Sequence, residues 1–458
     1  MTSRFRYRLA ATLGPLALSL LLTLSGCGDA GNTSYVDSPD LLEKLGDKPE
    51  LKPEAQQKAV ALRGEVHAQL VALFGDSPRQ IKVPAGVSLP GGGIYLASHQ
   101  EVEGKARPIK LVKPGETAAD AVNQQGGYGL YRKHCLHCHG VSGAGDGPTS
   151  AFLYPRPRDY RRGLYKFTST ISLHRPARAD LRKTLKNGLH GTSMPAFEAL
   201  MSDAEIEQVV DYVIFLSLRG EVERGLIDAA ANDGELSKDA INDTTSVVFR
   251  NWKNAENEIE NPPTPRTAPT RESVVRGRNL FLGVNQTGNK VECTTCHGPQ
   301  GMGNGPSFVA QEIFNTVVFG GDPSRQDERL KEEADRVSAE AMKKSDDPKI
   351  GQAAAEKFLD AWKKGSLDDW GNPFRPANLN RGVYKGGRRP IDLYWRIAKG
   401  INGAKMPAHF PTLQPPQIWD LVNFVLALPY DPALLDGPDV PAPIVPSLAA
   451  PKPSVAQH

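Results

Sequence analysis

Two short segments concentrate the residues that can bind a metal or carry out redox chemistry. The segment CLHCHGVSGAGDGP begins at Cys135, and CTTCHGPQGMGNGP begins at Cys293, so the pattern C-x-x-C-H occurs twice. Closely spaced cysteines occur in zinc sites, redox-active dithiols and haem attachment sites. Zinc would need two further ligands at finger-like spacing, and none lies nearby in the sequence. A thioredoxin-type dithiol would need a strand-to-helix setting, whereas both motifs lead into glycine-rich loops.

The repeat indicates which histidines belong to the motif. The two segments align without a gap and place His139 opposite His297, whereas His134 and His137 have no counterpart. C-x-x-C-H is the signature of c-type haem attachment, in which both sulfurs bind one porphyrin and the adjacent histidine faces the iron. The sequence therefore predicts two covalently bound haem c groups. The predicted attachment and ligand residues are Cys135, Cys138, His139, Cys293, Cys296 and His297.

Two methionines are candidates for the second axial position of each iron. Met194 in LKNGLHGTSMPAF and Met406 in IAKGINGAKMPAHF share a G-x-x-G-x-x-M-P pattern, at an offset of 212 residues that continues into the following segment. In the first half, His174 and His190 are possible alternatives to Met194. Because His190 aligns with Asn402, the repeat favours methionine.

The segments around the motifs predict helices that cross closely. SDAEIEQVVDYVIFL begins with a capping box, Ser202 with Glu205, and then shows apolar residues at helical spacing. Glycines precede both motifs, and a glycine on one helix permits an aromatic residue on another to approach closely. We expect Gly127 to lie against Tyr212, and Gly277 against Phe424.

This order of elements resembles a class I c-type cytochrome, and it occurs twice, at about 118–220 and 271–430. The resemblance implies an all-α fold with two tandem cytochrome c domains, each enclosing one haem with His/Met ligation. It implies His139 with Met194, and His297 with Met406, as the axial pairs.

Both halves also carry a repeated tyrosine motif, RGLYK at Arg162 to Lys166 and RGVYK at Arg381 to Lys385. Its arginine and tyrosine are suited to hydrogen bonds with haem propionates. The alternative is a turn whose tyrosine packs on the haem edge.

The first residues resemble an export signal. Three arginines precede an apolar run that ends in LTLSGC, which predicts a lipoprotein signal peptide at 1–26 and lipidation of Cys27. Ordinary cleavage with an unmodified thiol is the alternative. Either way we expect an exported protein, and with lipid a protein anchored on the periplasmic side of a bacterial membrane. No later segment is apolar enough to span a bilayer.

The remaining regions differ in composition from the two repeats. We expect an irregular N-terminal region at 27–117 with one amphipathic helix at 59–75, and a linker at 221–270 with a Pro-rich stretch from Glu260 to Arg271. We also expect a disordered, Pro-rich tail at 431–458. An insertion at about 314–371 is rich in Ala, Glu and Lys, which favours solvated helices. A docking surface for a redox partner, or a cover over the second haem, is the alternative for this insertion.

The predicted iron ligands favour an electron carrier. A six-coordinate His/Met iron leaves no open position for substrate, and methionine raises the reduction potential. We expect single-electron transfer with a quinol-oxidising complex, a periplasmic dehydrogenase or a haem–copper oxidase as partner. The alternative is an enzyme, a dihaem cytochrome c peroxidase. The formal charge of +3, without a basic block, gives no indication of nucleic-acid binding.

Overall fold

The structure is a computed structural model. It describes residues 34–38, 41, 44–46, 52–78, 81–91, 99–102, 105–108, 126–284, 291–306, 326–342, 348–370 and 375–436. The expected signal peptide, Cys27 and nearly all of the expected tail lie outside these residues. Ser34–His458 forms one unit, separate from Met1–Thr33. No helix within the described ranges is long and apolar enough to cross a membrane.

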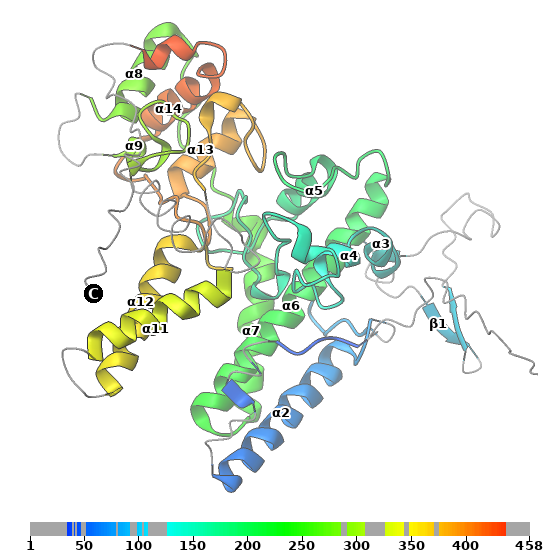
Figure 1. The fold of residues 1–458 in the computed structure, drawn as a ribbon. Coiled ribbons are helices and arrows are strands. Elements are labelled where there is room, and N and C mark those ends of the chain that lie inside the picture. The colour runs from blue at the N-terminus through cyan, green and yellow to red at the C-terminus, as the bar shows by residue number, and fades with distance from the viewer. Residues whose placement is uncertain are drawn as a thin grey trace, which may run out of the picture. The chain divides into compact units, whose positions relative to one another are not determined.

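The described chain is helical apart from one short antiparallel hairpin, β1 (His99–Val102) with β2 (Lys105–Pro108). This confirms the all-α prediction. The helices in chain order are α2 (Pro53–Phe74), α3 (Gly126–His134), α4 (Leu136–His139), α5 (Arg178–Asn187), α6 (Asp203–Asp233), α7 (Lys238–Asn254), α8 (Arg271–Leu282), α9 (Cys293–His297), α11 (Gln326–Met342), α12 (Pro348–Ser366), α13 (Pro390–Lys399) and α14 (Pro415–Ala427) (Figure 1). Short 3-10 helices are η3 (Ser150–Phe152), η4 (Tyr160–Arg162), η5 (Ala255–Glu258), η7 (Leu379–Arg381) and η8 (Pro432–Leu435).

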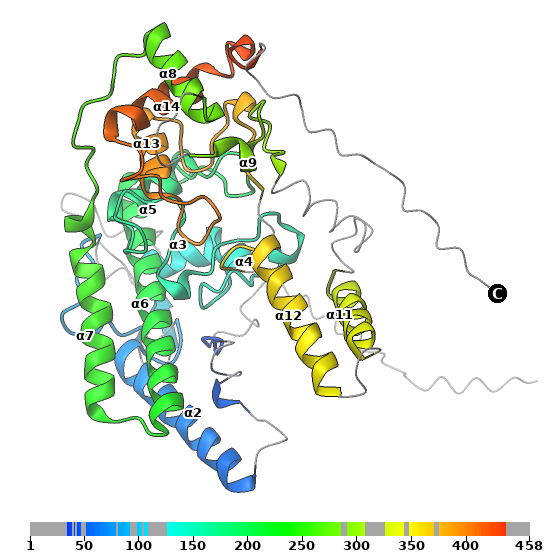
Figure 2. The same cartoon turned by 90° about the vertical axis from the view of Figure 1, so that its left-hand side faces the viewer.

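Helix α6 is the centre of the first half of the chain, residues 126–258. The backbone N–H of Ser202 donates to Glu205 Oε2 at 2.8 Å and the Glu205 N–H donates to Ser202 Oγ at 3.3 Å, so the predicted capping box is present. The helix ends at Gly234, whose φ of 70° suits a left-handed cap. Helices α3, α5 and α7 pack around α6, and α2 lies along it (Figures 1 and 2).

The expected linker at 221–270 is mostly helical, which corrects that domain boundary. Helix α6 continues to Asp233, and α7 follows almost at once, because four apolar side chains beyond position 220 are buried. These are Val222, Leu226, Ile227 and Ala230. Residues 234–237 connect α6 to α7, and 260–270 lacks helix and strand. The latter segment packs on α14, where Trp419 Nε1 donates to the Thr264 carbonyl at 3.0 Å.

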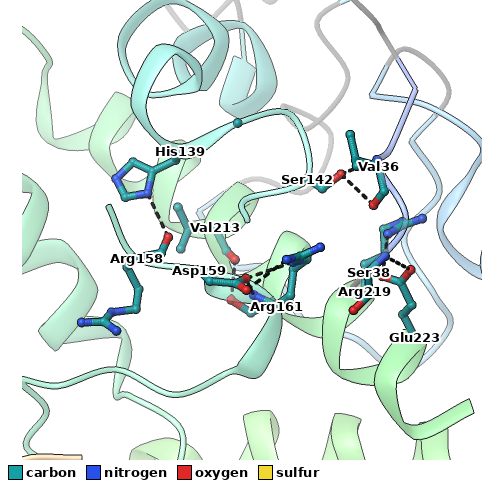
Figure 3. A network of polar contacts seen from close by, with 12 residues as sticks. Val36, Ser38, His139, Ser142, Arg158, Asp159, Arg161, Val213, Arg219 and Glu223 are labelled. Carbon is teal, nitrogen blue, oxygen red and sulfur yellow. Dashed lines mark hydrogen bonds and ion pairs between the residues drawn. The ribbon is translucent and has the colours of Figure 1, made fainter. Parts of the chain in front are cut away.

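The N-terminal region joins the first half through helix and extended chain. The segment expected to be one amphipathic helix lies within α2, whose Leu62, Val66, Leu70 and Phe74 are buried in the first core. Further upstream, the Val36 N–H donates to Ser142 Oγ at 2.6 Å (Figure 3). This places an N-terminal residue directly on the loop that follows α4.

The second half, residues 271–436, has a core of its own. Helices α8 and α14 pack together and α13 packs on α14, with Phe281, Tyr394, Ile418 and Phe424 among the most buried side chains. The core extends to Leu434 and Leu435 in η8, so the ordered chain continues slightly past the expected boundary at 430.

Both expected close crossings of helices are confirmed. A Cβ placed on Gly127 would overlap the Gln208 carbonyl and lie 3.2 Å from the Cβ of Tyr212. A Cβ on Gly277 would lie 2.8 Å from the Cβ of Phe424. In each half the helix before the motif therefore crosses the C-terminal helix at a glycine.

The two halves are in contact within the unit. Asn402 links them, since its Nδ2 donates to the Tyr165 carbonyl and its Oδ1 accepts from the Leu173 N–H, both at 3.0 Å. Asp392 of α13 accepts from Lys183 Nζ of α5 at 2.5 Å. The insertion supplies helices α11 and α12, which pack against each other, and most of their described side chains are exposed or half-buried.

Candidate haem sites

The first motif is folded as a single helical turn that brings its three chemical residues together. The Cys135 N–H donates to the Tyr131 carbonyl at 2.7 Å, and Cys135 then begins α4. The Cys135 carbonyl accepts from the N–H of Cys138 at 3.1 Å and of His139 at 2.9 Å. Tyr131, fully buried, donates from its hydroxyl to the Gly140 carbonyl at 2.8 Å. The motif is therefore attached to the core on both sides.

Burial favours the uncharged thiol at one cysteine of each motif. All four described cysteines are free thiols, and burial raises the pKa of both Cys135 and Cys293 to about 12. A reactive or metal-binding cysteine needs a lowered pKa, because the thiolate is the active form. In the part of the chain that the structure describes, no three His, Cys, Asp or Glu side chains gather as metal ligands.

His139 is held so that one ring nitrogen is free for a metal. Its Nδ1 lies 3.1 Å from the Arg158 carbonyl oxygen, as Figure 3 shows. A carbonyl only accepts, so Nδ1 carries the proton and Nε2 presents its lone pair. Burial lowers the pKa of His139 to about 4, and the ring stacks on Tyr160 with centroids 4.6 Å apart. The imidazole is thus neutral and fixed in orientation, as an iron ligand must be.

The glycines of the motif wrap the loop around that histidine. The Gly145 N–H donates to the His139 carbonyl at 2.9 Å and the Gly147 N–H to the Cys138 carbonyl at 3.1 Å. A Cβ on Gly145 would lie 2.5 Å from the Pro157 carbonyl oxygen, so no larger residue fits. The repeated glycines are therefore explained by backbone packing.

The second motif repeats these hydrogen bonds. The Gly303 N–H donates to the His297 carbonyl at 2.8 Å and the Gly305 N–H to the Cys296 carbonyl at 2.9 Å. His297 Nδ1 lies 3.0 Å from the Ala377 carbonyl oxygen, and burial lowers the pKa of His297. The backbone position of Ala377 thus corresponds to that of Arg158.

The two methionine loops are also alike. The Met194 carbonyl accepts from the Leu189 N–H, and the Met406 carbonyl accepts from the Ile401 N–H, both at 3.1 Å. Each loop begins at a glycine with φ of 65° or 74°, where a Cβ would lie 2.6 Å from the methionine carbonyl oxygen. Both methionine side chains are half-buried and pack on the core of their own half.

The other histidines of the first half, which are the alternatives to the predicted iron ligands, are exposed or contact other side chains. His174 and His190 are exposed, and His174 Nδ1 lies 3.7 Å from Glu258 Oε2. His137 is exposed, and the half-buried His134 contacts Phe197 edge-on at 6.0 Å.

The tyrosines of the RGLYK and RGVYK motifs bind protein groups. Tyr165 OH pairs with Ser217 Oγ at 2.8 Å, and Tyr384 OH donates to the Val425 carbonyl at 2.8 Å. The Tyr165 hydroxyl contacts α6 and the Tyr384 hydroxyl contacts α14. This geometry favours the alternative of a turn whose tyrosine packs on the haem edge over a hydrogen bond to a propionate. Arg162 donates to the Asp369 carbonyl.

One residue near the second site was not predicted. His409 follows Met406 by three positions and is half-buried. Burial lowers the pKa of His409, and the charge of His297 lowers it further. The sequence contained a signal for this residue, because the second half has MPAH where the first half has MPAF, so that His409 corresponds to Phe197.

The residues fit a covalently attached haem c. Cys135, Cys138 and the free Nε2 of His139 come from one helical turn, and glycine loops pack behind them. The same description holds for Cys293, Cys296 and His297.

Comparison with known proteins agrees for the first site. Residues 122–213 match the family described as cytochrome c oxidase, cbb3-type, subunit III. This stretch is therefore similar to a c-type cytochrome domain, a class that carries covalently bound haem c and transfers electrons. No curated protein matches the chain significantly. Among solved structures, a chain of the Kuenenia stuttgartiensis reducing HAO-like protein complex is 23% identical, with a TM-score of 0.40; the match covers 65% of this chain and 93% of that one.

Proposed function

We propose that this protein is a dihaem electron carrier, with tandem cytochrome c domains that hold one haem each. The observation that supports this is the repeated histidine geometry: His139 and His297 both donate from Nδ1 to a backbone carbonyl. The repeated methionine loops support Met194 and Met406 as the second ligands. A haem with these ligands supplies a reversible one-electron centre without an open position for substrate. The protein's own residues would orient the ligands and exclude water.

Haem content and potential test this proposal together. The mature chain, produced with haem maturation, should contain two haems and show two one-electron waves at positive potential. A variant with Cys293→Ser and Cys296→Ser should keep one haem and one wave. One haem in the unaltered protein would contradict the dihaem proposal. A strongly negative wave would contradict His/Met ligation at one iron.

The membrane anchor is part of the proposal. The segment LTLSGC, which ends at Cys27, supports lipidation and placement on the periplasmic side of a bacterial membrane. Incorporation of labelled palmitate, lost on Cys27→Ser, tests the anchor. Label retained in the Cys27→Ser variant would contradict it.

The redox partner is proposed from chemistry. A quinol-oxidising complex or a periplasmic dehydrogenase would be a donor, and a haem–copper oxidase an acceptor. The family matched at 122–213 is named for a cytochrome c oxidase subunit, which supports the oxidase. Two rates test these partners: the rate at which a purified oxidase oxidises the reduced protein, and the rate at which quinol-oxidising membranes reduce the oxidised protein. The first tests the acceptor and the second tests the donor.

A dihaem peroxidase is the second candidate function, and the presence of His409 supports it. A histidine three positions after Met406 is of a residue type that can assist peroxide chemistry or replace the methionine. Peroxide turnover that disappears on His409→Phe, the residue type of the other half, would support the enzyme. Absence of turnover in the unaltered, fully loaded protein would exclude it.

A further inference from the structure

The end of the insertion reaches the first half of the chain. Asp368 Oδ2 accepts from Lys166 Nζ at 2.5 Å, with the Asp368 side chain almost fully buried. The next residue, Asp369, accepts through its carbonyl from Arg162 and donates from its N–H to the Gly403 carbonyl at 3.0 Å. This short segment therefore contacts both halves at once.

Trp370 is the side chain at the centre of that contact. The Arg158 guanidinium lies over its ring, with Cζ 3.6 Å from the ring centroid. On the other side the ring packs against Gly403, where any Cβ would overlap it. Gly403 belongs to the loop that carries Met406, and the Arg158 carbonyl holds His139. The tryptophan thus lies between parts of the two candidate haem sites.

Two buried donors in this contact have no hydrogen-bond partner among the residues that the structure describes. They are Arg158 Nη1 and Trp370 Nε1. Both groups only donate, so neither can satisfy the other. The nearby Asp368 carboxylate already accepts from Lys166 and from the Trp370 backbone N–H at 3.0 Å. Because unpaired buried donors are rare in folded proteins, this pair indicates a missing acceptor.

We propose that Arg158 and Trp370 bind a propionate carboxylate of the haem at His139, so that the second half completes the first haem site. This rests on the proposed haem attachment. A carboxylate accepts several hydrogen bonds, which suits a guanidinium and an indole N–H as donors. Burial lowers the pKa of Arg158 to about 10, although the Asp368 and Asp159 carboxylates oppose this shift.

The second half provides a natural comparison. Ala377 occupies the backbone position that corresponds to Arg158, and it has no side chain that donates. The inferred contact therefore belongs to one haem only. Its effect must appear in one of the two redox waves.

The test is the pair of variants Arg158→Gln and Trp370→Phe, with exposed Arg156→Ala as the matched control. A cation near the propionate favours the reduced haem, so Arg158→Gln should lower the potential of one wave. We expect about a tenfold lower ratio of reduced to oxidised haem, or about 59 mV for one electron. Trp370→Phe should shift the same wave by less. Arg156→Ala should shift neither.

Haem content separates this inference from the proposed function. Two haems in every variant with both waves unchanged would overturn the carboxylate contact and leave the carrier intact. A shift of the other wave would also overturn it. Fewer than two haems in the unaltered protein would instead contradict the proposed function.

A measurement on the unaltered protein avoids variants that fail to fold. With ¹⁵N-labelled tryptophan, the indole N–H of Trp370 should be protected from exchange and should shift between the oxidised and reduced states. Trp252, whose Nε1 donates to Glu221 at 2.7 Å, should be protected without that shift. An exchanging, unshifted Trp370 indole would overturn the inference.

Discussion

Gly277 of α8 lies directly against the backbone carbonyl of Asp420 in α14, so closely that a Cβ would overlap the oxygen. Gly127 has the same relation to Gln208 in the first half. Each crossing sets the distance between the helix before a C-x-x-C-H motif and the helix after its methionine. The spacing of the helices on either side of each motif thus depends on two glycines.

Gly277→Ala should destabilise the protein by about 1–3 kcal/mol, because the added methyl must separate two packed helices. Chemical denaturation of the haem-loaded protein measures the change. Gly64→Ala is the matched control, since nothing lies within 4 Å of a Cβ at that position of α2. There the substitution should be neutral or stabilise by up to about 1 kcal/mol, because alanine is the better helix former. Equal stability of the two variants would mean that the crossing tolerates a side chain.

Stability should depend on Lys399 at alkaline pH. Burial lowers the pKa of Lys399 from 10.5 to about 8, although Asp180 and Glu260 oppose the shift. Between these values the unfolded chain binds more protons at this site than the folded protein, so the free energy of unfolding should increase as pH rises from about 8 to 10.5. Below about pH 8 Lys399 is charged in both states, so the free energy of unfolding is reduced by the full cost of burying the charged side chain.

Denaturation at several pH values measures the Lys399 effect. Lys399→Met should remove the increase in the free energy of unfolding between about pH 8 and 10.5, whereas Lys253→Met, at an exposed position, should leave that increase unchanged. An unchanged slope in Lys399→Met would show that another group is responsible.

The buried Asp392 carboxylate should hold the halves together. It accepts from Lys183 of the first half at 2.5 Å and from Arg389 Nη2 at 2.8 Å. Burial alone would raise the pKa of Asp392, but the Arg389 and Lys183 hydrogen bonds outweigh it and the pKa is lowered. Asp392→Ala leaves Lys183 half-buried without its partner and should cost about 3 kcal/mol or more.

Limited proteolysis of 260–270, with denaturation, measures whether the halves separate in the Asp392→Ala variant. Exposed Asp360→Ala serves as the control. A variant as resistant and as stable as the control would show that other contacts suffice.

Replacement of each methionine should affect its own haem. Met194→Ala and Met406→Ala should each lower one potential, because the thioether stabilises the ferrous iron. Redox titration of the haem-loaded variants assigns the two waves. Met342→Leu, in α11, should leave both unchanged. If both methionine variants retain both potentials, the second ligands are other residues.

The sequence by itself predicted the chemistry of the sites. C-x-x-C-H is a local pattern that needs one helical turn, so its residues were predictable without the fold. The repeat then separated His139 from His134 and His137, since only a position present twice is required twice. Helix crossings at Gly127 and Gly277 followed from small residues placed opposite aromatic ones.

Only the tertiary structure decided how the sites are supported. The carbonyls of Arg158 and Ala377 that orient the histidines are backbone groups, which any residue type supplies, so no sequence pattern marks them. The extent of α6 past residue 220 depends on burial against helices distant in the chain. The placement of Trp370 over Arg158 joins residues more than 200 positions apart, and contacts at that separation are set by packing rather than by local preference.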